Sequence, residues 1–181
     1  MKLSTRYIIL CLFTLSSAFG RAESVEHDFD AMWRKSPREL VLTNSYHTGT
    51  TDFCTYTCSE GAEFVLYDLG KNKSALTVSL NEAGKQVTTT QIHNLDSIRF
   101  MYYPANDALT LTVEVSKDSV SWNEVTVKDG VGGVKTAKMN QADDYYVRFK
   151  GIDRNAVYLK LVKYIYIDLS GCPNCFLYRP E

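Results

Sequence analysis

Residues 97–103, with the sequence SIRFMYY, and residues 109–116, with the sequence LTLTVEVS, decide the fold class of this chain. Every other residue of the second segment is apolar, which is the period of side chains on a half-buried strand. A helix with about 3.6 residues per turn would scatter the same apolar side chains around its circumference. The first segment alternates in the same way. The turn-forming residues 104–107 between the segments predict a hairpin with a longer loop, at the centre of an antiparallel sheet.

Shorter candidate strands lie on both sides of this pair, separated by turns rich in Gly, Asn, Asp and Lys. They cover residues 39–43, 52–57, 62–69, 75–80, 86–93, 144–150 and 156–168. Because no helices alternate with the strands, the pattern predicts an all-β fold, an antiparallel jelly-roll β-sandwich, rather than a βαβ fold. Lys163 interrupts the apolar face of the last strand, which predicts a bulge or a strand end there. The expected core includes Leu111, Val113, Val147, Phe149, Leu159 and Leu161.

Four segments follow from length and hydropathy. Residues 1–20 have a basic start, an apolar run and small residues at the end, which is typical of a signal peptide. We expect residues 21–36 to form an N-terminal arm with a short helical turn, 37–170 to form the sandwich and 171–181 to form a cysteine-containing tail. The apolar run is too short to span a membrane, so no transmembrane segment is expected in the mature chain. The expected location is secreted or periplasmic.

The charges exclude one class of partner. The 20 Lys and Arg residues nearly balance the 21 Asp and Glu residues, and the two signs are interspersed. A nucleic acid requires a concentrated basic surface, so none is expected as a partner. His27, His47 and His93 show no metal-binding spacing, and no Ser-His-Asp order is present. No catalytic residue and no metal ligand is therefore predicted.

Four cysteines outside the N-terminal apolar run form one pair with C-x3-C spacing and one with C-x2-C spacing: Cys54, Cys58, Cys172 and Cys175. The spacing fits disulfides, a tetrahedral zinc site, or a thiol redox pair of the Cys-Pro-x-Cys kind. An exported chain favours disulfides, because oxidising compartments preserve them. The zinc and redox alternatives remain open.

The expected disulfides join the two halves of the chain. Cys54 and Cys58 on one face of a strand would be about 13 Å apart, whereas a disulfide needs Cα atoms about 4.4 to 6.8 Å apart. The pairs Cys54–Cys175 and Cys58–Cys172 fit a single antiparallel register to within one residue. We therefore predict these two bonds. A bridge between Cys172 and Cys175 is the competing interpretation.

Three segments in the second half of the chain, 111–125, 145–149 and 157–167, resemble a known family. In order they read LTVEVSKDSVSWNEV, YYVRF and VYLKLVKYIYI. They are similar to the second half of a galactose-binding-like jelly roll of the discoidin and carbohydrate-binding-module type, in which a strand, an S-x-D-G-x-x-W turn, a Y-V-R strand and a final apolar strand follow one another. The resemblance covers residues 96–168. Ser119 replaces the usual Gly, and the family's N-terminal Asp-Gly with a following Trp is not found.

The resemblance implies both structure and function. In this family the Trp of the turn packs beneath it and the strand Arg pairs locally, which here are Trp122 and Arg148. Ligands bind in loops at one end of the sandwich, through an aromatic ring and polar side chains. Candidates of these types are Tyr46, His47, Tyr103, Asn106 and Asp107. A structural calcium ion is also frequent in such sandwiches, although no ligands for it are identifiable here.

The expected function is that of a secreted, noncatalytic carbohydrate-binding or attachment module, whose partner is a polysaccharide or a cell-surface glycan. A structural or protein-interaction sandwich without affinity for sugar is the main alternative. A jelly-roll polysaccharide lyase or glycosidase is a further alternative, because paired carboxylates can converge from distant loops.

Overall fold

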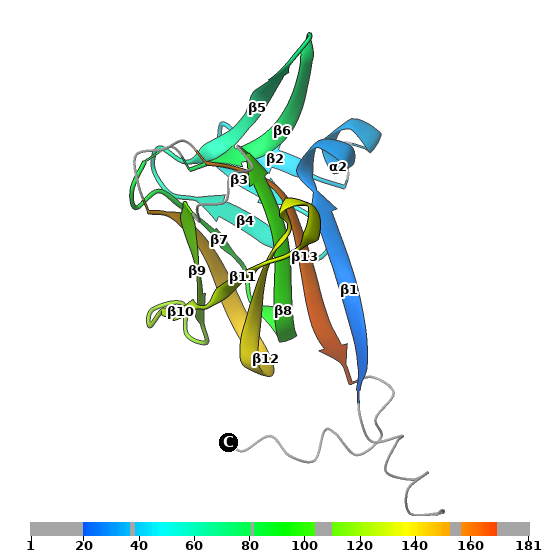
Figure 1. Cartoon of the computed structure of the whole chain (residues 1–181), viewed down its shortest axis with the longest axis vertical. Helices are drawn as coiled ribbons and strands as arrows, with labels where there is room; N and C mark the ends of the chain where they lie inside the picture. Colours follow the sequence, from blue (N-terminus) through cyan, green and yellow to red (C-terminus); the bar gives the residue numbers. More distant parts are fainter. Residues whose placement is uncertain (1–19, 37–38, 81, 104–109, 153–156, 170–181) are drawn as a thin grey trace, which may run out of the picture.

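The structure is a computed structural model that describes residues 20–36, 39–80, 82–103, 110–152 and 157–169. Its strands lie in two antiparallel sheets, which confirms the predicted all-β sandwich (Figure 1). The first sheet contains β1 (Arg21–Asp28), β5 (Glu63–Gly70), β6 (Lys73–Ser79), β8 (Ile92–Tyr103), β11 (Val127–Asp129) and β13 (Tyr158–Asp168). The second contains β2 (Val41–Thr43), β3 (Thr48–Thr50), β4 (Thr55–Cys58), β7 (Gln86–Thr89), β9 (Leu111–Ser116) and β10 (Asn123–Val125). Two short helices, α2 (Phe29–Lys35) and the 3-10 turn η1 (Val131–Gly133), complete the described part.

The strand β12 (Lys135–Gly151) is long enough to belong to both sheets. Residues 135–145 pair with β8 in the first sheet, and residues 146–151 pair with β9 in the second. The pairing with β8 shifts register after Lys138 and again after Asp143. Bulged strands bend, and β12 turns here from one sheet into the other (Figure 1). We call residues 138–145 the corner of β12.

The predicted hairpin between the two central segments is wrong, although both segments are strands. β8 pairs with β12 and β13, whereas β9 pairs with β10 and β12. The two strands therefore lie in different sheets. Alternation shows which face of a strand is buried, but any strand that buries the matching face can be its neighbour.

The core lies between the two sheets. Five of the six predicted core side chains have no exposed surface: Leu111, Val113, Val147, Phe149 and Leu159. Across the layers, the ring of Phe149 meets that of Phe100 edge to face, with centroids 5.4 Å apart. Leu161 is only half-buried, so this core prediction is wrong.

A bulge in β13 explains both Leu161 and Lys163. The pairing of β13 with β8 shifts register between Leu159 and Leu161, so the next fully buried residue is Val162. Lys163 then points away from the core, and its Nζ lies 3.7 Å from a carboxylate oxygen of Glu26 on β1. The predicted bulge is confirmed, a few residues earlier than expected.

Residues 21–36, predicted as an arm, hold β1 and α2. The whole of β1 pairs with β13, at the edge of the first sheet. Asp28 caps the helix by accepting a hydrogen bond from the backbone N–H of Ala31 at 3.0 Å. Phe29 is completely buried, with its ring centroid 5.2 Å from that of Tyr56. The segment is thus packed into the sandwich.

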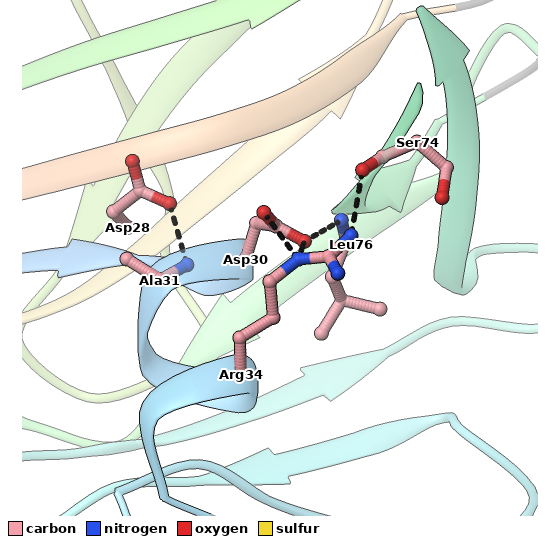
Figure 2. A network of polar contacts seen from close by, with 6 residues as sticks. All are labelled: Asp28, Asp30, Ala31, Arg34, Ser74 and Leu76. Carbon is pink, nitrogen blue, oxygen red and sulfur yellow. Dashed lines mark hydrogen bonds and ion pairs between the residues drawn. The ribbon is translucent and has the colours of Figure 1, made fainter. Parts of the chain in front are cut away.

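Helix α2 also holds β6 beyond the point where β6 stops pairing with β13 (Figure 2). β13 pairs with β6 only at residues 78–79. Beyond them, Asp30 accepts a hydrogen bond from the backbone N–H of Leu76 at 2.9 Å, and Arg34 donates to the backbone oxygen of Ser74 at 2.8 Å. Asp30 and Arg34 are bonded to each other at 2.9 Å. Two side chains therefore replace a strand partner and support the projecting β5–β6 hairpin.

No helix in the described part of the chain is long and apolar enough to span a membrane.

Candidate functional site

A cleft of about 520 Å³ lies at the corner of β12. One wall consists of the end of β9, the turn 116–122 and β10, and the other consists of the corner of β12. Its side chains combine cations, carboxylates and amides with a partly exposed aromatic ring and an apolar thioether. The lining includes Lys117, Lys138, Asp118, Glu124, Asn123 and Asn140, together with Tyr145 and Met139. A cavity of this volume and mixed lining suits a small ligand.

Asp118 fixes the turn that borders the cleft. Its carboxylate accepts hydrogen bonds from the backbone N–H groups of Ser121 at 2.7 Å and Val120 at 2.8 Å, and from the hydroxyl of Ser116 at 2.8 Å. These bonds, led by the N–H of Ser121, hold the pKa of Asp118 well below its usual range. A general acid needs a raised pKa, so Asp118 is a structural carboxylate and not a proton donor.

The turn rests on a tryptophan, as the family resemblance implies. Trp122 donates from its ring N–H to the backbone oxygen of Ser119 at 3.2 Å. The guanidinium of Arg148 lies 4.0 Å from the centroid of the Trp122 ring and forms an ion pair with Glu114 on the neighbouring strand β9. The expected positions of Trp122 and Arg148 are confirmed.

Ser119 explains why the family has glycine at this point of the turn. Its φ angle is +62°, in the left-handed region that glycine adopts without steric cost. The serine keeps the same turn at the expense of some strain.

A lysine links the two walls of the cleft. Lys117, next to β9, forms an ion pair with Asp143 on β12, and its Nζ lies 5.9 Å from the centroid of the Tyr145 ring. The hydrogen bond between Lys117 and Asp143 raises the pKa of Lys117 and lowers the pKa of Asp143. Both groups therefore stay charged at neutral pH, which places a fixed cation beside an aromatic ring.

Tyr46 and His47 lie in the turn between β2 and β3, away from the cleft. Asn44, Ser45 and Tyr46 all have positive φ angles, of 51°, 52° and 69°. The side chain of Tyr46 is 58% exposed. His47 uses its Nδ1 in a 2.8 Å hydrogen bond with the backbone oxygen of Ala62, and because a carbonyl only accepts, Nδ1 carries the proton. His47 thus ties two parts of the backbone together.

Tyr103 belongs to a cluster of half-buried rings at the end of β8. Its ring stacks on that of Tyr67, with centroids 5.0 Å apart and planes inclined by 10°. Tyr158 lies 4.5 Å from Tyr67, and the Nζ of Lys160 lies 5.8 Å from the Tyr103 ring. The cluster joins three strands, so Tyr103 is a cross-strand partner.

Among the candidate ligand-binding residues that the structure describes, Tyr46 and Tyr103 make separate contacts. The backbone oxygen of Tyr46 accepts from the N–H of Phe64, whereas the ring of Tyr103 stacks on that of Tyr67. Neither tyrosine lines the cleft. Asn106 and Asp107 lie outside the described residues. What sequence reasoning missed is the lining of the cleft, above all Tyr145; its position two residues before Val147 in the Y-V-R strand was the available signal.

Cys54 and Cys58 point into the core. They are 4% and 9% exposed, and burial raises the pKa of each thiol to about 12. Neither forms a disulfide with another described residue, while Cys172 and Cys175 lie outside the described part. The register argument for their pairing is wrong in one respect, because β3 and β7 occupy both edges of β4. The bonds Cys54–Cys175 and Cys58–Cys172 remain a prediction for nonreducing peptide mapping.

In the part of the chain that it describes, the structure adds no metal ligands to those considered from the sequence. Among the described residues, no group of three or more His, Cys, Asp or Glu side chains is placed to hold a metal ion. The structural calcium implied by the resemblance therefore remains a prediction without identified ligands.

Comparison with known proteins finds similar structures. No protein-family profile and no curated protein sequence matches the chain. CpGH89CBM32-6 produced by Clostridium perfringens is 17% identical over 65% of this chain and 96% of its own, with a TM-score of 0.42. The K2 cleaved adhesin domain of Lys-gingipain is 11% identical over 78% and 99%, with a TM-score of 0.48. TmCBM27, a carbohydrate-binding module described for specific mannan recognition, is 10% identical over 81% and 98%, with a TM-score of 0.34.

These structures include carbohydrate-binding modules. With TM-scores of 0.34 to 0.48, they carry no argument about what this chain binds.

Proposed function

We propose that this chain is a noncatalytic carbohydrate-binding module whose ligand binds in the cleft at the corner of β12. The observation that carries the proposal is the ring of Tyr145 among exposed amide, amine and carboxylate groups. A sugar has an apolar C–H face, which packs on an aromatic ring, and hydroxyl groups that both donate and accept hydrogen bonds.

The polar lining matches the second requirement. Lys117 and Lys138 donate, Glu124 accepts, and the amides of Asn123 and Asn140 do both. All five side chains are exposed, so they are hydrated in the free protein and exchange water for sugar hydroxyls on binding. Such exchange gives modest affinity per contact and selectivity through geometry.

The cleft is better suited to binding than to glycoside hydrolysis. Hydrolysis needs two carboxyl groups that flank the bond, one of which has a raised pKa. Asp118 is held ionised by the turn, and Asp143 is held ionised by Lys117. Neither can therefore protonate a leaving group near neutral pH, so an enzyme at this cleft would need Glu124, the other carboxylate of the lining, as its acid.

The partner that fits this proposal is a polysaccharide or a cell-surface glycan outside the cell. Export rests on the signal-like pattern of residues 1–20.

The test is a panel of plant, algal and host polysaccharides, measured by calorimetric titration of the purified protein. We expect saturable binding of at least one glycan without new reducing ends over time. Tyr145→Ala should weaken that binding about fivefold or more, since stacking contributes about 1 kcal/mol or above. The matched control is Tyr146→Ala, which changes the neighbouring tyrosine outside the cleft lining. Release of reducing ends would establish an enzyme instead.

A protein-interaction role is the second candidate, favoured by the tip of the β5–β6 hairpin. Leu66 and Leu69 there are 54% and 45% exposed, and the hairpin projects from the body of the molecule (Figure 1). Exposed apolar side chains on a projecting element are typical of contact surfaces. No binding across the glycan panel, together with a partner lost on Leu66→Ser and Leu69→Ser, would favour this role.

A further inference from the structure

A second cavity, of about 330 Å³, lies beside His27. We call it the His27 pocket. It is bordered by β1, α2 and the segment 51–53 between β3 and β4, on the opposite flank of the sandwich from β10. Its walls are mostly apolar and include Val25, Met32 and Phe53. A volume near the lower end of the range for ligand sites suits a small group or a single ring.

His27 stands at the base of this pocket and is only 2% exposed. Its Nδ1 lies 2.6 Å from the hydroxyl of Tyr56, and the hydroxyl of Tyr164 donates to that of Tyr56 at 3.0 Å. Both tyrosines are completely buried. Three side chains from β1, β4 and β13 thus form one hydrogen-bond chain across the two sheets.

The direction of these hydrogen bonds decides which nitrogen of the His27 ring carries the proton. Tyr56 accepts from Tyr164 and has one proton of its own, and the inferred site uses the His27 tautomer in which that proton is donated to Nδ1. Burial lowers the pKa of His27 to about 4, so the ring is neutral at pH 7. A neutral imidazole that accepts at Nδ1 carries its proton on Nε2. Within the described part of the chain Nε2 has no hydrogen-bond partner, which leaves a fixed N–H donor for a ligand.

The rim of the pocket carries acceptors. Glu26 and Glu39 are engaged by Lys163 at 3.7 Å and Lys35 at 3.1 Å. Asp52 is exposed and pairs with no residue that the structure describes. The pocket therefore offers one donor at its base, an apolar wall and a free carboxylate at its mouth.

From this arrangement we infer that the His27 pocket binds the acetamido group of an N-acetylated hexosamine. The carbonyl oxygen accepts from Nε2–H of His27, and the methyl group packs on Met32 and Phe53. The amide N–H and a ring hydroxyl donate toward Asp52. A free anion would be repelled by the three rim carboxylates, and a cation would face the N–H of His27.

This site is separate from the cleft, and one spectrum distinguishes the two. Met32 lines the His27 pocket and Met139 lines the cleft. Protein labelled with ¹³C on its methionine methyl groups is titrated with N-acetylglucosamine, N-acetylgalactosamine, glucose and N-acetyl-lysine amide. We expect a saturable shift of the Met32 signal with at least one N-acetylated hexosamine and none with glucose.

Four results would overturn the inference: no shift of Met32, an equal shift with glucose, a shift with N-acetyl-lysine amide instead, or a shift of Met139 alone. The last would place the sugar in the cleft and support the proposed function while removing this site. A Met32 shift with a silent Met139 would support this site independently of the proposed function.

Variants test the two polar contacts. Asp52→Asn, at an exposed position that folding tolerates, should raise the dissociation constant about fivefold or more. His27→Gln keeps a carbonyl for Tyr56 and an N–H for the ligand, so it should retain binding, whereas His27→Phe should abolish it. If His27→Phe does not fold, Asp52→Asn decides: an unchanged dissociation constant contradicts the inferred geometry. Tyr145→Ala, in the cleft, is the matched control and should leave the Met32 titration unchanged.

Discussion

The cleft at the corner of β12 and the His27 pocket are built in opposite ways. In the cleft, lysines and carboxylates are exposed, so solvent screens their interactions and losing one changes stability little. In the pocket, the donor of His27 is held by Tyr56 and Tyr164, which have no exposed surface. Breaking a buried hydrogen bond leaves a polar group without water, which is costly. Substitutions in the cleft should therefore change binding with little effect on stability, whereas substitutions in the pocket should also change folding.

The largest effect is expected in the core between the two sheets. Phe149→Ala should lower the free energy of unfolding by about 3 to 5 kcal/mol, because Phe149 is fully buried against Phe100 and a cavity would remain. Chemical denaturation measures the change. A loss below about 1 kcal/mol would contradict the packing of the two sheets described here.

The next effect is a difference between the two cavities in how the free energy of unfolding depends on pH. Burial lowers the pKa of His27 from 6.5 to about 4, so the unfolded chain binds a proton before the folded protein does. Stability from this group is complete above pH 6.5 and falls by about 3 kcal/mol as the pH drops towards 4. The neighbouring groups Tyr56, Tyr164 and Cys54 have pKa values raised by burial and stay neutral in this window.

Chemical denaturation at pH 7.5 and pH 4.5 measures this slope, and His27→Gln is the control in which it should flatten. Asp118 in the cleft lining and Asp143 on the corner of β12, whose pKa values are lowered, lose their contribution only below their unfolded pKa of 3.8. An unchanged slope in His27→Gln would show that the acid sensitivity arises elsewhere.

A matched pair of hydroxyl deletions gives a smaller contrast. Tyr56→Phe leaves Nδ1 of His27 without its hydrogen-bond partner and should cost about 1 to 3 kcal/mol. Tyr145→Phe, in the cleft, should change stability by less than about 0.5 kcal/mol, since its ring is partly exposed. Thermal and chemical denaturation of the two variants compare them directly. Equal losses would remove the distinction between the cavities.

The smallest effect concerns the turn that borders the cleft. Ser119→Gly should stabilise the protein by about 0.5 to 1 kcal/mol, because glycine adopts the left-handed φ of +62° without strain. Val120→Gly is the control: its φ is not left-handed, so glycine there should only destabilise. Stabilisation by both substitutions, measured by denaturation, would mean that the backbone conformation of Ser119 is not the cause.

The sequence predicts strands and buried faces better than it predicts neighbours. Alternation identified Val147 and Phe149 as core residues, and an interrupted stripe identified the bulge before Lys163. It could not show that β8 and β9 lie in different sheets, because β12 is the shared partner of both. Strand pairing is decided by the whole set of strands, not by the period of any one.

The two cavities also differ in how much of each lies close together in the sequence. The cleft borders the turn 116–122, which the sequence identified as a turn of the family but not as part of a binding site. The His27 pocket is assembled from residues 25–27, 32, 39 and 51–53. These meet only because β1 pairs with β13 and α2 packs beside it, and no local pattern records that.

The most direct test of carbohydrate binding in the cleft is a titration of protein labelled with ¹³C on its methionine methyl groups, using oligosaccharides from the glycans in the panel. Met139 is 4% exposed and lines the cleft, so it reports on occupancy there. We predict that at least one oligosaccharide shifts the Met139 signal to saturation and that Tyr145→Ala abolishes the shift while Tyr146→Ala preserves it. A Met139 signal that no oligosaccharide moves, or that moves equally in Tyr145→Ala, would contradict the account.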